Sequence, residues 1–176
     1  FAAALLAGCA TGPDANPRDP LEPFNRGVSS FNDAVDRAVL KPVATAYQDA
    51  TPGFVRSGVN NFFGNLRDVW SAVNATLQLK PRAATENALR VGINTMFGFG
   101  GLSDLATEMG IERTSLDFGQ TLGRWGVPSG PYLVLPVFGP SSFRDAGGLV
   151  VDSRADLVGN LDDISDRNVL YSLRVV

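Results

Sequence analysis

The sequence predicts an all-α fold interrupted by one extended or hairpin segment near residues 126–140. Apolar residues recur at steps of three and four through most of the chain, which is the spacing of one helical face. Prolines and glycines cluster between these stretches, where helices are expected to end. The segment 126–140 differs, because prolines every few residues forbid a helix while its valines and aromatics favour extended backbone. With 44% hydrophobic residues among 176, we expect one domain with an apolar core.

The first predicted helix covers residues 23–40, and proline at position 42 is expected to end it. Its apolar face is expected to hold Phe24, Val28, Phe31, Val35 and Val39. A further short helix is predicted over residues 43–50. Thr51 followed by Pro52 then resembles a helix N-cap with proline at the first helical position. The helix opened there is predicted to continue through Leu77 and to end before Pro81.

The next predicted helix, over residues 82–97, has an apolar face and a second face of small residues. Ala84, Ala88 and Gly92 are spaced four apart on that second face, so we expect it to permit close helix packing. Four shorter helical pieces are then expected over residues 103–110, 116–123, 142–151 and from 166 onward. Asp104 is predicted to cap the first of these pieces, and Ser142 with Asp145 resembles a capping box that opens the third.

The N-terminus is typical of a bacterial lipoprotein signal. An apolar run closes on small residues before Cys9, the sole cysteine, whose thiol can carry acyl chains. Two or more chains anchor a protein firmly to a bilayer. We expect residues 1–8 to be a signal-peptide remnant, residues 9–18 a lipidated, flexible tether, and residues 19–176 a helical domain. The sequence is expected to be truncated at both ends. A core cysteine near a frayed end is the alternative.

The residue types argue against an enzyme, a metal site and a nucleic-acid partner. The chain has no histidine, which removes the commonest general base and metal ligand. It also lacks a phosphate-binding Gly-rich loop with lysine, so neither a catalytic residue nor a cofactor is expected. Helix caps and turns account for the candidate ligands Asp104, Asp117, Asp145 and Asp152. A net charge of −3 gives no basic patch for nucleic acid.

An ordered series of motifs resembles the MlaA (VacJ) family of outer-membrane lipoproteins. These are DPLEPFNR (19–26), FN (31–32), NFFGNL (61–66), Asn74, LQ (77–78), DFGQTLG (117–123), WG (125–126), GPYL (130–133), LP (135–136), GPS (139–141) and RD (144–145). The resemblance implies a ring-shaped, membrane-embedded helical domain, tethered in the periplasmic leaflet of the bacterial outer membrane, with an amphipathic pore. It also implies further helices beyond residue 176 that help close the ring.

The function implied by the resemblance is retrograde phospholipid transport that maintains outer-membrane lipid asymmetry. Phospholipid mislocalised to the outer leaflet would pass through the pore to a periplasmic lipid carrier, MlaC, and the protein would associate with a trimeric porin. The absence of a catalytic set and the broad apolar helices agree with this function. Two alternatives remain open. One is a non-conducting scaffold lipoprotein that binds porins, and the other is an envelope phospholipase, against which the absence of histidine weighs.

Two stretches are candidates for the lipid path. Asn61 and Phe62 lie where the resemblance implies a pore-facing helix, and they pair an amide with an aromatic ring. An ordinary core position for Phe62 and a cap or surface position for Asn61 are the alternative. Gly130, Pro131, Tyr132 and Leu133 match the loop beside the pore, where proline stiffness and glycine freedom can make a gate, and the alternative there is a plain structural turn.

Overall fold

The computed structural model describes residues 19–159, 163–165, 167–168 and 170. The predicted signal remnant, the lipidation site Cys9 and the tether lie outside these residues. In chain order the elements are α2 (Glu22–Val35), the π-helix η1 (Asp36–Leu40), α3 (Lys41–Ala50), α4 (Gly53–Leu77), α5 (Pro81–Met96), α6 (Leu105–Glu108), α7 (Phe118–Arg124), β1 (Tyr132–Leu135), β2 (Gly139–Ser142) and α8 (Phe143–Arg154). Residues 164–165, 167–168 and 170 are also helical, so helical backbone is present before the predicted start at residue 166.

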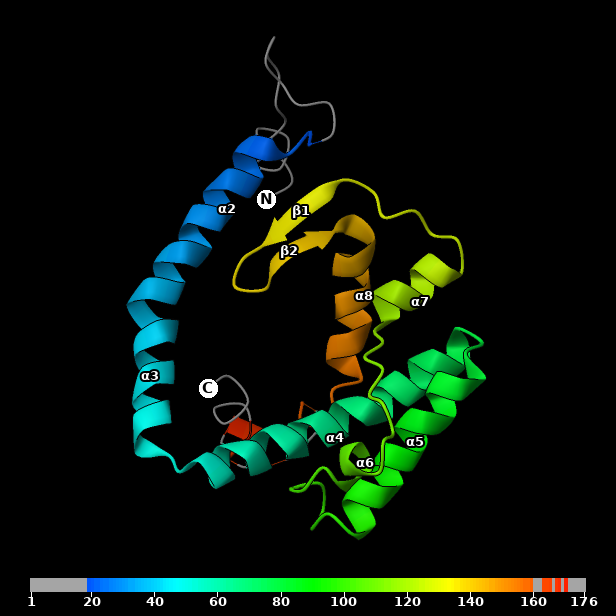
Figure 1. Ribbon diagram of the computed structural model, residues 1–176. Coiled ribbons are helices and arrows are strands. Elements are labelled where there is room, and N and C mark those ends of the chain that lie inside the picture. The colour runs from blue at the N-terminus through cyan, green and yellow to red at the C-terminus, as the bar shows by residue number, and fades with distance from the viewer. Residues whose placement is uncertain (1–18, 160–162, 166, 169, 171–176) are drawn as a thin grey trace.

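The elements are arranged as a ring (Figure 1). One side is an almost continuous arm of α2, η1 and α3, and α4 forms the next side after a sharp turn. Helix α5 packs along α4, while α7, α8 and the β1–β2 hairpin complete the circuit. The ring closes where β1 contacts α2. The predicted helical ring with a hairpin near residues 126–140 is therefore confirmed.

The predicted end of the first helix at Pro42 is wrong. Helical backbone continues from Glu22 to Ala50, because a π-helical segment, Asp36–Leu40, directly precedes the proline. Proline lacks an N–H donor and its ring crowds the carbonyl one turn earlier. A π turn relieves that crowding, since it loosens the usual hydrogen-bond ladder at this point. Pro42 consequently lies in the first turn of α3 and does not end the arm.

Two details of the middle helices also differ from expectation. Helix α4 begins at Gly53 with Pro52 at its N-cap, and Thr51 instead ends α3. The small-residue face of α5 is not the packing face, because an added Cβ at Gly92 would meet nothing within 4 Å. Helix α5 packs on α4 through a polar face that holds Asn87, Arg90 and Asn94, all buried. Polar side chains reach across this interface, as in the Arg90–Asp68 contact.

The caps predicted for the second half are present. Asp104 accepts a hydrogen bond from the Thr107 N–H, which makes it the N-cap of α6. Ser142 caps α8 by accepting from the Asp145 N–H at 3.2 Å. The hairpin pairs Tyr132 with Ser142 at its open end and Leu135 with Gly139 at its turn. Local sequence signals thus determine both the start of α8 and the strand pair that leads into it.

The expected apolar core is small, and most of the ring is held together by polar side chains. Among the described residues, the buried apolar side chains are Phe63, Ala75, Ala106, Leu116, Val134 and Val158. The buried polar ones are Asn25, Asn65, Asp68, Ser71, Asn74, Gln78, Asn87, Arg90, Asn94 and Thr121. Large apolar side chains lie outside instead, including Phe54, Phe99 and Met96, which are 79%, 86% and 77% exposed. This distribution is inverted relative to an ordinary water-soluble domain.

Candidate functional site

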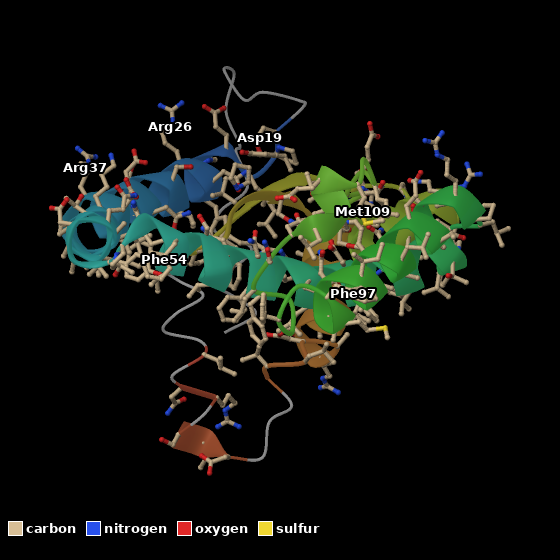
Figure 2. The ribbon with its side chains drawn as sticks, turned by 60° about the horizontal axis from the view of Figure 1, so that its bottom comes forward. Asp19, Arg26, Arg37, Phe54, Phe97 and Met109 are labelled. Carbon is tan, nitrogen blue, oxygen red and sulfur yellow. The ribbon has the colours of Figure 1, made fainter. Side chains whose placement is uncertain are left out.

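The two faces of the ring differ in polarity. Figure 2 shows Asp19, Arg26 and Arg37 along one face, and Phe54 and Phe97 along the other. Exposed apolar side chains occur on α2, η1, α3, α4 and α5 and in the loop before α6. An exposed apolar surface of this extent marks a contact with lipid or with another protein. No helix in the described part of the chain is long and apolar enough to cross a membrane.

Buried charges join α4, α5 and the loop around α6. The guanidinium of Arg90 is fully buried, with its Nε 3.1 Å from an oxygen of Asp68 and its Nη2 2.7 Å from Asp104. Arg113 also contacts both carboxylates, with its Nε 2.9 Å from Asp68. Each buried charge therefore has opposite charges in contact, which is the condition under which buried ions are tolerated. The cluster is a structural joint, since it fixes α4, α5 and the loop to one another.

The charge state of Asp104 follows from the same contacts. Burial by itself would raise the pKa of this carboxyl group, because it disfavours the charged form. Hydrogen bonds from Thr107, Asn94 and Arg90 to the carboxylate outweigh burial and lower its pKa to about 2. Asp104 is thus ionised at any pH at which the protein functions, and the joint stays charged.

A second polar cluster joins α4 to α7. The Thr121 hydroxyl donates to the Asn74 side-chain oxygen at 2.6 Å and accepts from the Gln78 amide at 2.9 Å. Nearby, Ser71 exchanges hydrogen bonds with the backbone of Leu116. Polar side chains spaced three and four residues apart on α4 therefore connect this helix to α5 on one side and to α7 and the segment before it on the other. Hydrogen bonds of this kind connect helices firmly where water is scarce.

The predicted path residues Asn61 and Phe62 are both half-buried on α4. The Asn61 amide donates to the Leu102 carbonyl at 3.0 Å, which ties α4 to the loop before α6. The ring of Phe62 lies edge-on to that of Phe63, with centroids 5.5 Å apart. These contacts give Asn61 a structural partner and leave part of the Phe62 ring accessible.

The predicted path residues Gly130 to Leu133 form the entry to the hairpin. Gly130 has a φ of +70°, a backbone conformation that favours glycine. Pro131 is exposed and accepts a hydrogen bond from the Phe143 N–H. Tyr132 is 43% exposed, its carbonyl accepts from Asn25, and Leu133 is half-buried. The stretch thus leads into the hairpin and supplies the first two residues of β1, and its place beside a lipid path stays a prediction.

The structure does not bring these two sets together in one pocket. Figure 1 places α4 and the hairpin on opposite sides of the ring, so the two sets can face one another only across the centre of the ring.

Two asparagines connect the hairpin to the arm. The Asn25 side chain bonds the Tyr132 carbonyl and the Val134 N–H, and Asn32 does the same for Leu135 and Val137. The sequence motifs did not indicate this role for the two asparagines, although both asparagines lie within matched motifs.

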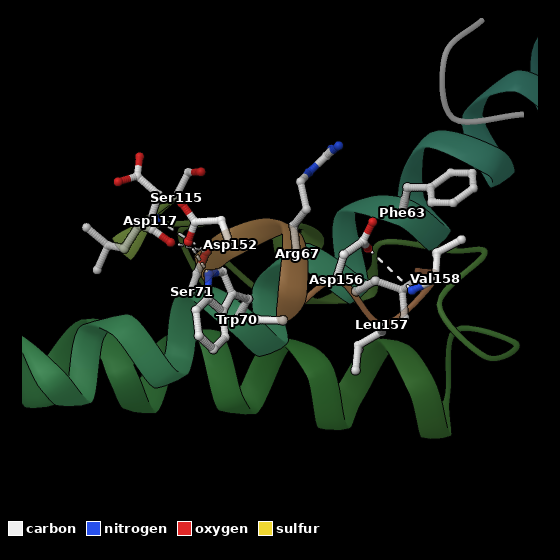
Figure 3. A pocket seen from close by; sticks show the side chains of 13 residues that line it. Phe63, Arg67, Trp70, Ser71, Ser115, Asp117, Asp152, Asp156, Leu157 and Val158 are labelled. Carbon is white, nitrogen blue, oxygen red and sulfur yellow. Dashed lines mark hydrogen bonds between the residues drawn. The ribbon is translucent and has the colours of Figure 1, made fainter. Parts of the chain in front are cut away.

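A cavity of about 190 Å³ lies between α4, the segment 115–117 before α7 and the segment that follows α8 (Figure 3). Its apolar lining includes Phe63, Leu66 and Leu157. On the polar side, the Trp70 indole N–H donates to Asp152 at 2.7 Å, and the same carboxylate oxygen accepts from the Phe118 N–H. Asp152 therefore joins three elements, which the sequence prediction of a cap or turn did not include. The volume is below that of ordinary small-molecule pockets.

The aspartates considered above as candidate metal ligands have hydrogen-bond partners within the fold. The described residues contain no group of three or more His, Cys, Asp or Glu side chains that could hold a metal. Asp104 and Asp117 cap helices, and Asp145 pairs with Arg144 and with the Ser142 cap. The pKa of Asp145 is lowered, chiefly by its hydrogen bond from Arg144. These carboxylates are thus committed to structure.

The MlaA lipoprotein family model matches residues 17–176. The chain belongs to the MlaA lipoprotein family. It is 42% identical over 154 residues to the Intermembrane phospholipid transport system lipoprotein MlaA of Escherichia coli K12, covering 84% of this chain and 61% of that protein. An uncharacterised protein of Rickettsia typhi is 39% identical over 137 residues, covering 78% of this chain and 55% of its own length. The chain thus spans little more than half the length of the first curated relatives it matches.

A solved structure supports the ring-shaped MlaA fold. It comes from a study of the structural basis for maintenance of bacterial outer-membrane lipid asymmetry and is 35% identical to this chain. The match has a TM-score of 0.75 and covers 89% of this chain and 80% of that one. At this identity and coverage the arrangement of elements around the ring is a property of the family.

Proposed function

We propose that this protein removes mislocalised phospholipids from the outer leaflet of the outer membrane and passes them through its ring to a periplasmic lipid carrier. The observation that carries the proposal is the inverted polarity of the ring. Large apolar side chains are exposed on its helices, while buried polar and charged side chains hold its wall together. A ring with such an exposed apolar surface can lie in a lipid leaflet. The names of the E. coli and Shigella flexneri relatives support the same function.

Energetics explain why such a ring is needed. Releasing a two-chain phospholipid into water would expose about thirty methylenes, at a cost on the order of 25 kcal/mol. A passive protein must therefore keep the acyl chains in apolar surroundings from bilayer to carrier. The exposed apolar side chains provide such surroundings at the edge of the ring. The absence of histidine supports a non-enzymatic role, in which the protein lowers a barrier and leaves the lipid chemically unchanged.

The proposal includes the location and the partners. Acylated Cys9 would anchor the ring in the periplasmic leaflet through the tether at residues 9–18. A trimeric porin would hold the ring in place, and the carrier MlaC would accept lipid from its periplasmic side. Asn61, Phe62 and the stretch Gly130 to Leu133 are proposed to border the lipid path from opposite sides of the ring.

Surface phospholipid in living cells tests this function. Deletion cells would be complemented with the full-length gene as wild type, Cys9→Ala, Phe62→Ala or the exposed control Thr85→Ala. The readout is acylation of lipid A by an outer-membrane enzyme that acts only when phospholipid reaches the outer leaflet. We expect deletion to raise this signal, and wild type and Thr85→Ala to restore it. Cys9→Ala and Phe62→Ala should restore it poorly.

Substitutions are preferable to deletion of residues in α4. Removing two residues would turn the remainder of the helix by about 200° and displace its polar face. A loss of function could then not be assigned to the two deleted side chains. If gene deletion left surface phospholipid unchanged, transport would be excluded and the porin-binding scaffold would be the better account. If only Phe62→Ala behaved as wild type, the path assignment would fail and the function would stand.

A further inference from the structure

A second cavity, of about 390 Å³, lies at the corner where α3 turns into α4. Its polar lining consists of Tyr47, Gln48, Arg56, Ser57 and Asn60. None of its described lining residues is acidic. The cavity therefore presents one positive charge and several hydrogen-bonding groups, with no carboxylate to neutralise or repel a ligand.

One hydrogen-bond donor of the arginine in this cavity lacks a partner. The Arg56 Nε is buried and has no hydrogen-bond partner among the described residues. The two arginines of the arm behave differently, since Arg26 and Arg37 each pair with an acidic residue one turn away. A buried guanidinium N–H without an acceptor is costly. The missing acceptor is most simply a ligand oxygen.

The backbone adds to the positive character of the corner. Helix α4 has 25 residues, no acidic residue in its first turn and no side-chain cap at Pro52. Its N-terminus therefore carries an uncompensated partial positive charge. The Arg56 guanidinium lies beside it, because a Cβ added at Gly53 would be 3.9 Å from the Arg56 Nη2. Cation and helix terminus thus face the same small space.

We propose that this corner binds the phosphate of an anionic ligand, with Arg56 donating to the phosphate oxygens. Arginine matches a phosphate well, since its planar fork can donate two parallel hydrogen bonds. The inference deepens the proposed function and rests on it in one respect only, namely that the phosphate is that of a phospholipid headgroup. Free phosphate has the same recognition chemistry, so the test must separate the two sources.

The position of the cavity suits a headgroup. Phe54 is 79% exposed and lies two residues before Arg56, so the two side chains leave α4 about 200° apart. An acyl chain against the apolar outside of α4 and a phosphate in the corner would then lie at one end of the same helix. The headgroup contact would therefore lie at the same end of α4 as the exposed Phe54 but on the opposite side of the helix.

Binding to the full-length purified protein tests the proposal. The probes are the soluble short-chain lipid dihexanoyl-phosphatidylglycerol, inorganic phosphate, and the uncharged dihexanoylglycerol, each titrated by calorimetry at fixed ionic strength. We expect the short-chain phospholipid to bind and dihexanoylglycerol to bind at least tenfold more weakly. Arg56→Gln should weaken phospholipid binding about tenfold or more, since a charge-assisted hydrogen bond is lost. The matched control Arg26→Gln should leave it unchanged.

A second variant keeps the test independent of folding. Gly53→Asp places a carboxylate in the first turn of α4, within reach of Arg56, where it favours the helix and occupies the guanidinium. We expect it to abolish phospholipid binding while the protein stays folded by circular dichroism. Binding that is unchanged in both Gly53→Asp and Arg56→Gln would overturn the proposal.

The remaining outcomes identify the source of the phosphate. Inorganic phosphate binding that depends on Arg56, with no binding of the short-chain lipid, would support an anion site and overturn its link to the headgroup. Normal control of surface phospholipid in cells that carry Gly53→Asp would overturn a role for this site in transport. The proposed function would stand in that case, because it is judged by deletion of the whole gene.

Discussion

The two halves of the ring are held by different means. Helices α4 and α5 share a buried network of Arg90, Asp68 and Asp104. The arm of α2, η1 and α3 has one buried residue, Asn25, among its described positions. Its hydrogen bonds to the rest of the molecule come from Asn25 and Asn32, which bind the hairpin backbone. The comparison teaches that the α4–α5 half is a fixed frame, whereas the arm closes the ring through a few contacts at one end.

The largest expected effect comes from the fixed frame. Arg90→Met leaves Asp68 and Asp104 buried with only Arg113 as counter-charge. Breaking a buried ion pair in this way destabilises proteins by about 3–5 kcal/mol. Denaturant unfolding in detergent, followed by circular dichroism, measures the loss. Arg82→Met removes an exposed ion pair on the same helix and should leave the free energy of unfolding nearly unchanged. Equal losses for the two variants would refute the distinction.

The packing of α7 on α8 predicts a somewhat smaller effect. An alanine Cβ at Gly148 would lie 2.5 Å from the Gly119 backbone nitrogen, so the two helices would have to separate. We expect Gly148→Ala to destabilise the protein by about 1–3 kcal/mol. The neighbouring Gly147 has open space around it, so Gly147→Ala should be neutral or stabilising. Thermal unfolding of the two variants tests this expectation. Similar melting temperatures for Gly148→Ala and Gly147→Ala would show that the contact between Gly148 and Gly119 does not limit stability.

Acid should weaken the frame through Asp104. Its folded-state pKa of about 2 lies below the ordinary value of 3.8, so the stabilisation is complete above about pH 4. It is lost as the pH falls through 2, and amounts to about 2 kcal/mol. Unfolding free energies of wild type and Asp104→Asn, measured from pH 5 to pH 2, test this assignment. The variant should be less stable at pH 5 and should show a weaker pH dependence, whereas parallel curves would exclude Asp104 as the source.

The smallest expected effect on global stability is at the arm. Asn25→Ala removes the acceptor of the Val134 N–H and the donor to the Tyr132 carbonyl. Each of these two hydrogen bonds contributes about 1 kcal/mol, so local opening of the hairpin should increase roughly thirtyfold. Hydrogen exchange at Val134 measures this opening, with the exposed Ser29→Ala as control. Unfolding of α4 and α5 should be unaffected. A matching loss of global stability would show that arm and frame form one unit.

The sequence predicted the fold class because its local signals were clear. Periodic apolar residues located most of the helices, and Asp104 and Ser142 located two of their starts. The proline signal misled at Pro42, since proline usually ends a helix and here a preceding π turn permits continuation. The inverted core could not be predicted from periodicity, which detects an apolar face without showing whether it points to protein or to lipid.

The site was predicted less well than the fold. The amide residues Asn25, Asn65, Asn74 and Gln78 all lie within the matched motifs, and all are buried. The regular spacing of Asn87, Arg90 and Asn94 was also visible, yet polar residues on one helical face ordinarily indicate solvent. Arg56 had no signal in sequence, because its significance is that its buried Nε lacks a partner, which only the structure can show.

Transfer of phospholipid from bilayer to carrier tests the central claim most directly. Proteoliposomes that hold the full-length protein with a trimeric porin would carry a fluorescent phospholipid, and purified MlaC would be added in excess outside. The measurement is the rate at which labelled lipid appears on the carrier. We predict a rate clearly above that of liposomes with porin alone. A rate equal to the porin-only control would contradict lipid transport and favour a scaffold that binds porins without conducting lipid.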